Sequence, residues 1–570
     1  MHYNKSNYII FIFNFNFMNF KSIFSAVALS ALMVGCSSDD IELIPDNPTP
    51  DGGETTSGYM NIAINLPSVG SHDSRAGQEN DSFDDGLASE YAVTSAHLVL
   101  FNSDDESTAQ VRGVFTFNDL KPWNTDATIE NVTTSAKSVI KVDAPATKAL
   151  GALVVLNDPK AEDHFPINRK FKDLFAETSV VSQAEMINGG KFFMTNAPIY
   201  KNTTGKTLAT IRTNQIYNTY EAALQATPIE IFVERGVAKV NVTTAADLKN
   251  DVEIDGKTYQ ATVIGWSLDI TNKRSYMVRN IEGFYTWKDY TSATKGLRFY
   301  STASNRIYWA IDPNYDDAMD GDDAYVAENF NKITMLDINN GDELDEPVYV
   351  LENTFGVANQ RRTRTTRAII KASFASEGGV AEDFYQVGSS NTIYNKEGMR
   401  TVVIAQAMNV LDGKTDKAKY KFNDNTSVSA SAGAHKLSVG DVLYDGVELT
   451  ENEIETLNDA IGTINFYKDG VCYYVARIQH FGDEYTPWKP GDPTYGETLE
   501  GGKEQADRNY LGRYGVVRNN WYELQISEIK HLGNPDIPVA PNTPDDENEY
   551  YVSFKVNVHA WAKRVQNVIL

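Results

Sequence analysis

The chain has 570 residues, too long for one ordinary domain, and predicts two folded domains with processed or flexible ends. Its 51 Lys and Arg residues against 77 Asp and Glu give a formal net charge of -26, which repels phosphate backbones and so excludes nucleic acid as an expected partner. Thirty Tyr and 26 Phe residues, with many Val, Ile and Thr residues, favour strands over helices and predict an all-β fold.

The front of the chain has the pattern of an export signal. An apolar stretch over residues 23–34 follows a short basic segment and ends in Gly35-Cys36. The stretch is too short for a membrane-spanning helix, and its end is similar to a bacterial lipobox. Lipoproteins with this pattern are cut between the residues that correspond to Gly35 and Cys36, and the cysteine thiol is acylated. Residues 1–35 are therefore a predicted lipoprotein signal peptide, with Met1 or Met18 as its start.

The residues after Cys36 indicate a surface-exported tether. The acidic run Ser37-Ser38-Asp39-Asp40 resembles the signal that sends Bacteroidetes lipoproteins to the outer cell surface, although a solvated charge run is the plain alternative. Residues 44–58 are rich in Pro, Asp, Gly and Thr and cannot bury a core. We expect folded protein to begin after them.

The first strand of the chain is followed by a candidate cleavage site. Tyr59 to Pro67 alternates apolar and polar residues, which predicts a half-buried strand. The segment 68–85 is polar and contains one arginine, Arg75, followed by Ala76. An exposed arginine in a flexible segment is where a trypsin-like protease cuts. An ordinary first strand followed by an ordinary loop remains the alternative.

The middle of the chain reads as two strand-rich domains. Unbroken apolar runs at 98–101 and 152–156 are typical of strands buried on both faces of a sandwich. Apolar spacing between residues 171 and 187 predicts a helical insertion. The polar break at 244–255 predicts a boundary near residue 245, which gives an N-terminal domain over 76–245 and a C-terminal domain over 246–533.

Two features inside the second domain have plain interpretations. The basic run Arg361 to Arg367 precedes an apolar strand and predicts an exposed turn or edge, with a docking patch for an acidic neighbour as the alternative. Cys472 lies in an apolar run and is expected to be a small core residue. Because Cys36 belongs to the export signal, the mature chain has no internal disulfide framework.

The last 37 residues, 534–570, form a predicted arm and terminal strand. Four prolines in residues 534–548 favour extended chain, which spans up to about 45 Å at ~3.1 Å per residue. Beyond the arm, apolar residues alternate with polar ones over Val552, Phe554, Val556 and Val558. Such a strand can pair with its own body or with a neighbour's.

The sequence shows no pattern of catalytic or cofactor chemistry. The eight histidines are dispersed, and no phosphate loop or nucleophile motif is present. The acidic run from Asp312 to Asp323 fails the calcium-loop template, because Asp317 or Ala318 occupies positions that need other residues. Irregular calcium binding there stays open. We predict no enzyme, no cofactor and no metal.

Several segments together, in this order, resemble the Bacteroidales type V pilins, or fimbrillins, and most of all the minor fimbrium shaft subunit of Porphyromonas. The resemblance rests on their order along most of the chain, since each segment alone is a weak strand pattern. They are the lipobox, the first strand, Arg75-Ala76-Gly77, residues 191–196, 229–240, 349–354 and 515–532, and the terminal strand 551–561.

This resemblance implies two transthyretin-like β-sandwich domains with short helical insertions and a structural role in a surface fimbrium. It implies that residues 36–75 are a lipidated propeptide, cut after Arg75 by an arginine-specific protease, and that the first strand is then lost. A donor strand from another subunit would fill the vacated groove. The implied partners are other copies of the chain, anchor and tip fimbrial subunits, and host or bacterial receptors, on a fimbrium whose precursor is lipid-anchored to the outer membrane.

Other classes of protein share parts of this pattern. A fimbrial tip or accessory adhesin needs the groove but no outgoing donor strand, so the arm and terminal strand favour a shaft subunit. A surface glycan-binding lipoprotein would keep its Cys36 anchor and show an exposed aromatic platform. A surface hydrolase would need acid, base or metal residues in one pocket.

Overall fold

The computed structural model describes residues 55–67, 90–543 with gaps, and parts of the last 18 residues. The gaps are at 91, 119–131, 146–147, 255, 293–295, 301–304, 316–322, 335–343, 345, 377–378, 380, 424–425, 483–484 and 487–507, and the described C-terminal residues are 553–554, 557–560 and 565–569. By contacts, the described residues belong to one compact unit.

The first sheet has eight strands in the order β3-β2-β5-β9-β13-β1-β4, with β12 paired to β5. Every residue of β5 is buried, as are Leu98 to Phe101 of β2, which confirms the two strands predicted from unbroken apolar runs. The bounds are β1 Thr55–Pro67, β2 Ala96–Phe101, β3 Val111–Thr116, β4 Val132–Pro145, β5 Leu150–Leu156, β9 Met194–Asn196, β12 Ala209–Ile211 and β13 Ile229–Arg235.

Two further sheets enclose a second apolar core. One has the order β22-β14-β31-β34-β32, with β33 also paired to β31, and the other has the order β15-β16-β23-β30. Together with the first sheet they confirm the predicted all-β fold. The bounds are β14 Val237–Lys249, β15 Asp251–Ile254, β16 Lys257–Asp269, β22 Val348–Leu351, β23 Arg367–Ser376, β30 Val471–Arg477, β31 Asn520–Glu528, β32 Ser553–Phe554, β33 Asn557–Ala560 and β34 Val565–Ile569.

One continuous stretch of chain passes from the first sheet into the second. The strand β13 ends at Arg235, and β14 begins at Val237, so only Gly236 separates them. A Cβ atom on Gly236 would lie 2.4 Å from the sulfur of Met186, which leaves room for glycine alone. The predicted domain boundary near residue 245 lies within β14 and stays a prediction.

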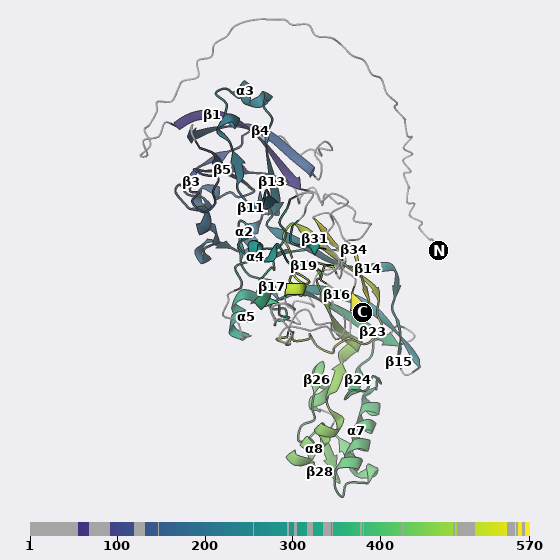
Figure 1. The fold of residues 1–570 in the computed structure, drawn as a ribbon. Helices are drawn as coiled ribbons and strands as arrows, with labels where there is room; N and C mark the ends of the chain where they lie inside the picture. Colours follow the sequence, from purple (N-terminus) through teal and green to yellow (C-terminus); the bar gives the residue numbers. More distant parts are fainter. Residues whose placement is uncertain are drawn as a thin grey trace, which may run out of the picture. The chain divides into compact units, whose positions relative to one another are not determined.

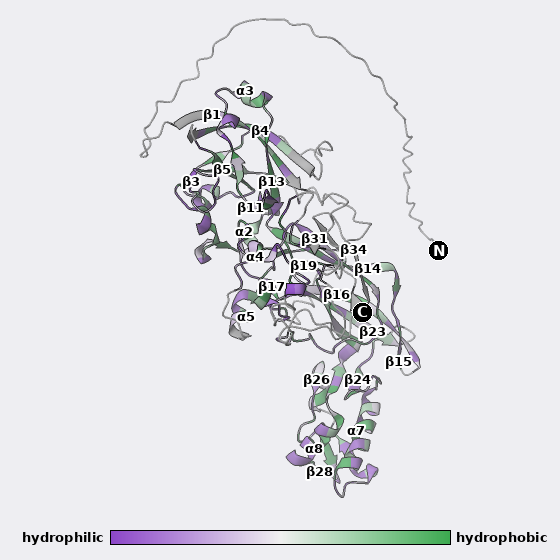
Figure 2. Ribbon diagram, viewed as in Figure 1, coloured by the Kyte–Doolittle hydropathy of each residue, from purple (hydrophilic) through white to green (hydrophobic). Residues whose placement is uncertain are grey.

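A third apolar core belongs to an insertion between β23 and β30 (Figure 1). Its two helices are α7, Lys396–Val410, and α8, Glu451–Ile461, and both carry hydrophilic and hydrophobic residues along their length (Figure 2). The other elements are β24 Phe384–Val387, η6 Lys417–Lys419, β25 Tyr420–Phe422, η7 Ser427–Ser429, β26 Gly433–His435, β27 Val442–Tyr444, β28 Val447–Glu448, β29 Ile464–Tyr467 and η8 Lys468–Gly470.

Short elements make up the remaining described structure. The helical insertion predicted over residues 171–187 is divided into η2, η3 and α2, with the short strand β6 between them. The bounds are α1 Ala161–His164, η2 Phe171–Phe175, η3 Glu177–Ser179, β6 Val180–Val181, α2 Gln183–Met186, β7 Ile187–Asn188, β8 Lys191–Phe192, β10 Ile199–Lys201, β11 Thr204–Lys206, η4 Thr213–Gln215, α3 Tyr220–Gln225, β17 Thr271–Asn272, β18 Ser275–Tyr276, α4 Phe284–Trp287, β19 Thr291–Ser292, β20 Gly296–Leu297, α5 Asp323–Asn329, β21 Phe330–Asn331 and η5 Val357–Asn359. Among the described helices, none has the length and apolar character needed to cross a membrane.

Candidate functional site

The first strand, β1, lies inside its sheet rather than at an edge (Figure 1). It pairs antiparallel with β4 from Thr55 to Pro67 and parallel with β13 from Ile62 to Asn65. Backbone N–H and C=O groups on both edges of β1 therefore form hydrogen bonds with a neighbouring strand. Removing this strand would leave unpaired N–H and C=O groups along β4 and along β13.

The inner face of β1 is part of the first apolar core. Met60 and Ile62 are fully buried, and Ile64 is 1% exposed. Full burial of one such side chain stabilises a fold by about 1.5–3 kcal/mol. Loss of β1 would therefore leave an apolar groove lined by the first core.

The outer face of β1 is also buried, which corrects the expected half-buried strand. Ala63 and Asn65 are fully buried and Asn61 is 8% exposed. The cover comes from α3 and the residues after it: the rings of Tyr59 and Tyr220 meet edge to face at 6.1 Å. Alternation along one strand carries no information about such a cover from residues 160 positions away.

The polar residues of this outer face have specific acceptors. The Asn61 side chain donates a hydrogen bond to the carbonyl oxygen of Ala226 at 3.0 Å. The Asn65 side chain donates to the carboxylate of Glu230, which lies at the start of β13. Because a buried amide without partners is costly, these acceptors select a hydrogen-bond donor at each position.

The C-terminal strands pair with the chain's own second sheet. The strand β33 is antiparallel to the first residues of β31, and β34 is parallel to the later residues of β31. Of the predicted donor residues, Phe554 belongs to β32 and Val558 to β33. Val552 and Val556 lie outside the described residues.

The first ten residues of the arm, 534–543, lie on the body. Asn534 and Tyr473 exchange two backbone hydrogen bonds, of 2.8 and 2.9 Å. The Arg362 N–H donates to the carbonyl of Thr543 at 3.0 Å, and Ile537 packs against a small apolar cluster on β23 and β30. The segment is therefore anchored at both ends of its described part.

Residues 363–367 of the basic run are buried, residues 361 and 362 are half-buried, and the arm contacts both ends of the run, so the expected exposed turn or edge is wrong. Arg364 is fully buried and Arg367 is 6% exposed. Arg367 forms an ion pair of 2.8 Å with Asp269 and also donates to the carbonyl of Pro538 in the arm. Sequence alone does not show that a segment 170 residues later covers this run.

The remaining predicted residues fall in two groups. Gly35, Cys36, Arg75 and Ala76 lie outside the described residues. Cys472 is fully buried in the second core, and burial raises the pKa of its thiol to about 12.

The acidic run at 312–323 differs from a solvated loop where it is described. Asp312 is 1% exposed, and its carboxylate accepts hydrogen bonds from the Asn314 N–H at 2.8 Å and the Thr354 N–H at 2.9 Å. Burial raises the pKa of Asp312 to about 7. Residues 316–322 lie outside the description, and the described residues contain no group of three or more His, Cys, Asp or Glu side chains placed to hold a metal ion.

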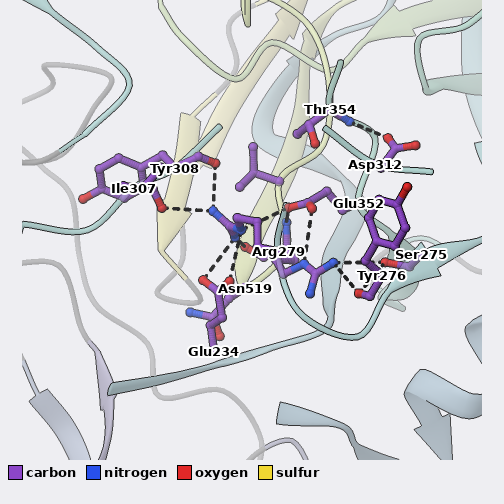
Figure 3. Close-up of polar contacts among 12 residues, drawn as sticks. Glu234, Ser275, Tyr276, Arg279, Ile307, Tyr308, Asp312, Glu352, Thr354 and Asn519 are labelled. Atoms are coloured by element: carbon purple, nitrogen blue, oxygen red, sulfur yellow. Dashed lines mark hydrogen bonds and ion pairs between the residues drawn. The ribbon is translucent and has the colours of Figure 1, made fainter. Parts of the chain in front are cut away.

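A buried charge cluster holds the end of β13, and the sequence analysis did not find it (Figure 3). Arg279 pairs with Glu234 at 3.0 Å and with Glu352 at 3.5 Å, while Arg306 pairs with Glu234 at 2.9 Å and Arg518 with Glu352 at 3.3 Å. Its members are spread from residue 234 to 518, so no local spacing reveals them. Because a buried charge without its partner is strongly destabilising, the cluster fixes one wall of the groove to the second sheet.

Glu90 adds a second buried anchor beside this cluster. Its carboxylate lies 2.8 Å from the Nζ of Lys239 on β14 and accepts a hydrogen bond from the Tyr349 hydroxyl on β22. The Arg235 side chain donates to the Glu90 carbonyl at 2.9 Å. The chain is thus fixed to the second sheet shortly after the candidate cleavage site.

Comparison with known proteins matches the C-terminal part of the chain to one family. Residues 498–567 match the family described as major fimbrial subunit protein type IV, fimbrillin, C-terminal. No curated protein matches the chain. The matched range contains β31, β32, β33 and the start of β34, and it confirms the resemblance to the fimbrillins for this part of the chain.

Several solved structures are similar over most of the chain, at low identity. A putative cell adhesion protein from Bacteroides eggerthii is 11% identical over 90% of this chain and 98% of its own, with a TM-score of 0.34. A fimbrilin from Porphyromonas gingivalis is 12% identical over 89% and 96%, with a TM-score of 0.29. A C-terminally truncated tip fimbrial protein from P. gingivalis is 11% identical over 82% and 94%, with a TM-score of 0.27.

Proposed function

We propose that this chain, which carries the C-terminal segment of the fimbrillins, is a shaft subunit of a surface fimbrium and polymerises by protease-triggered donor-strand exchange. In this proposal the precursor is lipidated at Cys36 and anchored to the outer membrane. An arginine-specific protease cuts between Arg75 and Ala76, and β1 leaves with the propeptide. The filament then joins anchor and tip subunits and supports adhesion to host or bacterial surfaces.

The observation that carries the proposal is the position of β1. The strand precedes the candidate cleavage site, so a cut at Arg75 separates it from the body. Its place is lined by apolar side chains and bordered by two ladders, which a strand from another subunit can satisfy by β-augmentation.

The terminal strand supplies a suitable donor. Val552, Phe554, Val556 and Val558 share one face of the alternating pattern, and their full burial would contribute roughly 6–12 kcal/mol gross, before ordering costs. Repeated head to tail, a groove and a donor on each copy make a heterologous contact that builds an open filament.

A tip subunit is the second candidate, and one observation favours it. The strands β33 and β34 pair with β31 of the same chain, as expected for a terminal segment that never leaves its body. A shaft subunit has to exchange these ladders for those of a neighbour's groove. Polymerisation of the purified, cleaved chain distinguishes the two roles.

The test places one charge on the apolar face of the terminal strand and one on its polar face. Burying an unpaired carboxylate costs several kcal/mol, so Val556→Asp should give folded, correctly cleaved monomers that do not polymerise. The matched control His559→Asp should polymerise nearly as the parent does. Electron microscopy and native gels measure filament length after cleavage.

Truncation after Asn548 removes the terminal strand altogether and should also give monomers. If the truncated chain forms filaments of ordinary length, the terminal strand is not the donor. If the full-length, cleaved parent stays monomeric while its groove accepts a synthetic peptide of residues 549–561, the tip role is correct.

A further inference from the structure

We propose that the terminal strand of a second copy takes the place of β1 in one register, with Tyr551 at the position of Tyr59 and Asn557 at that of Asn65. This inference rests on the proposed function and names its partner: a second copy of this chain. The incoming strand would run in the direction of β1, antiparallel to β4 and parallel to β13.

The two segments have the same pattern position by position. Residues 59–66 read YMNIAINL, and residues 551–558 read YVSFKVNV. Both begin with tyrosine, both have asparagine at the seventh position, and both have apolar residues at the second, fourth, sixth and eighth. The alternation alone would allow several registers, but the tyrosine and the asparagine coincide in one.

The apolar positions fit the groove in this register. Met60, Ile62 and Ile64 are 0–1% exposed in the first core. Val552, Phe554 and Val556 would replace them in that order. Valine is smaller and phenylalanine larger than the residue it replaces, so the sum of side-chain volumes changes little, which packed cores tolerate.

The polar positions fit the acceptors beneath α3. Asn557 would present a side-chain amide to Glu230, as Asn65 does. Ser553 would present a hydroxyl donor at the position from which Asn61 reaches the carbonyl of Ala226. The Tyr551 ring would meet Tyr220, which now packs against Tyr59. Each of the two acceptors of the outer face thus keeps a donor.

One position differs in charge and offers a test. Lys555 would replace Ala63, whose neighbours across the sheet are Glu230 on β13 and Lys137 on β4, both exposed. Because Ala63 is fully buried, the lysine stem would be buried in its place while the ammonium group reaches the exposed Glu230 carboxylate. The attraction to Glu230 would favour this register, and the like charge of Lys137 directly across from Lys555 would oppose part of it.

Shifts by two residues fit worse. A shift in one direction places the Tyr550 hydroxyl at the position of Met60, which is fully buried in the apolar core. The opposite shift places Lys555 beneath α3, at the position of Asn61, and moves its charge away from Glu230. The first shift thus buries a hydroxyl in an apolar core, and the second separates Lys555 from Glu230.

The test is a cysteine scan on the cleaved, full chain. Lys555→Cys is combined in turn with Ser135→Cys, Lys137→Cys and Val139→Cys, the residues of β4 opposite Asn65, Ala63 and Asn61. Directly opposed Cβ atoms lie about 4.5–5.5 Å apart and can be bridged with small shifts, whereas diagonal ones lie about 7–8 Å apart. Cys472 is buried and does not compete.

After oxidation, non-reducing gels should show a covalent ladder of subunits for Lys137→Cys and at least tenfold less for the other two. A ladder at Ser135→Cys or Val139→Cys instead would overturn the register and leave donor-strand exchange intact. Filaments with no ladder in any pair would overturn the register too, and the truncation after Asn548 then decides whether exchange itself fails.

A charge swap between Lys555 and Glu230 tests the same register through the yield of filaments, in case the cysteine pairs assemble poorly. Lys555→Glu should lower the yield of filaments several-fold, and adding Glu230→Lys should restore it. The control for altered groove charge leaves Lys555 unchanged. In it, Glu230→Lys alone should lower the yield of filaments, and adding Lys137→Glu should restore part of that yield by attracting Lys555 from the other side. An equal yield for Lys555→Glu and the parent would contradict the placement of Lys555 beside Glu230.

Discussion

The first strand and the terminal strands have nearly the same sequence pattern and opposite structural settings. In the first sheet, β1 has a neighbouring strand on each side and α3 over its outer face. In the second sheet, β33 and β34 share the side of β31 that faces away from β14. The alternation of apolar and polar residues therefore predicts a strand in both places. The neighbouring strands and helix determine how easily each strand can be released from its sheet.

The difference lies in the number of ladders that each strand gives up. Since β32 pairs with β34, release of β32, β33 and β34 together breaks only the pairing with β31 among the described ladders. Release of β1 breaks ladders on two sides and empties a core, so it requires both a cut and a replacement. In the proposed donor-strand exchange, cleavage and not spontaneous opening would therefore control assembly.

The largest expected effect comes from preventing cleavage after Arg75. Arg75→Ala should abolish polymerisation, because β1 remains covalently joined to the body and continues to occupy the groove. The uncleaved chain should keep palmitate label on Cys36, whereas N-terminal sequencing of parent filaments should begin at Ala76. Filaments whose subunits still begin at Cys36 would show that β1 does not have to leave.

A core substitution in β1 tests whether the strand is absent from the filament. Ile62→Ala should destabilise the precursor by about 2–5 kcal/mol, because it opens a cavity in the first core. The assembled filament should be as stable as the parent, since β1 is no longer present. Urea unfolding of precursor and filament measures both.

The matched control for this substitution lies in the second core. Ile370 on β23 is also fully buried, and Ile370→Ala should destabilise precursor and filament alike. If Ile62→Ala weakens the filament as much as Ile370→Ala does, β1 is retained after assembly.

The smallest expected effect concerns Cys472. Its thiol is fully buried and its pKa is raised to about 12, so almost no thiolate forms at neutral pH. Iodoacetamide should leave Cys472 unlabelled both before and after cleavage, as judged by intact mass. Labelling that appears only after cleavage would mean that loss of β1 loosens the second core as well.

Local sequence patterns predicted several buried strands, but the helices α7 and α8 were not predicted although they also have local patterns. The unbroken runs at 98–101 and 152–156 predicted buried strands because their chemistry is local. The helix α8 also has a local signal, a capping box of Thr450 and Glu453, and α7 repeats buried residues at Met399, Val403 and Ala407. The overall composition is rich in β-branched and aromatic residues and favours strands, so it gave no indication of either helix.

The sequence by itself determined the all-β class, the strand pattern of residues 59–67 and 551–558, and the order of segments that resembles the fimbrillins. Only the tertiary structure decided which of these strands is interior, which acceptors face Asn61 and Asn65, and that the arm contacts Arg367. The physical reason is distance along the chain: an alternating pattern reports that a face is apolar, whereas burial of the other face depends on residues such as Tyr220 or Pro538, more than 150 positions away.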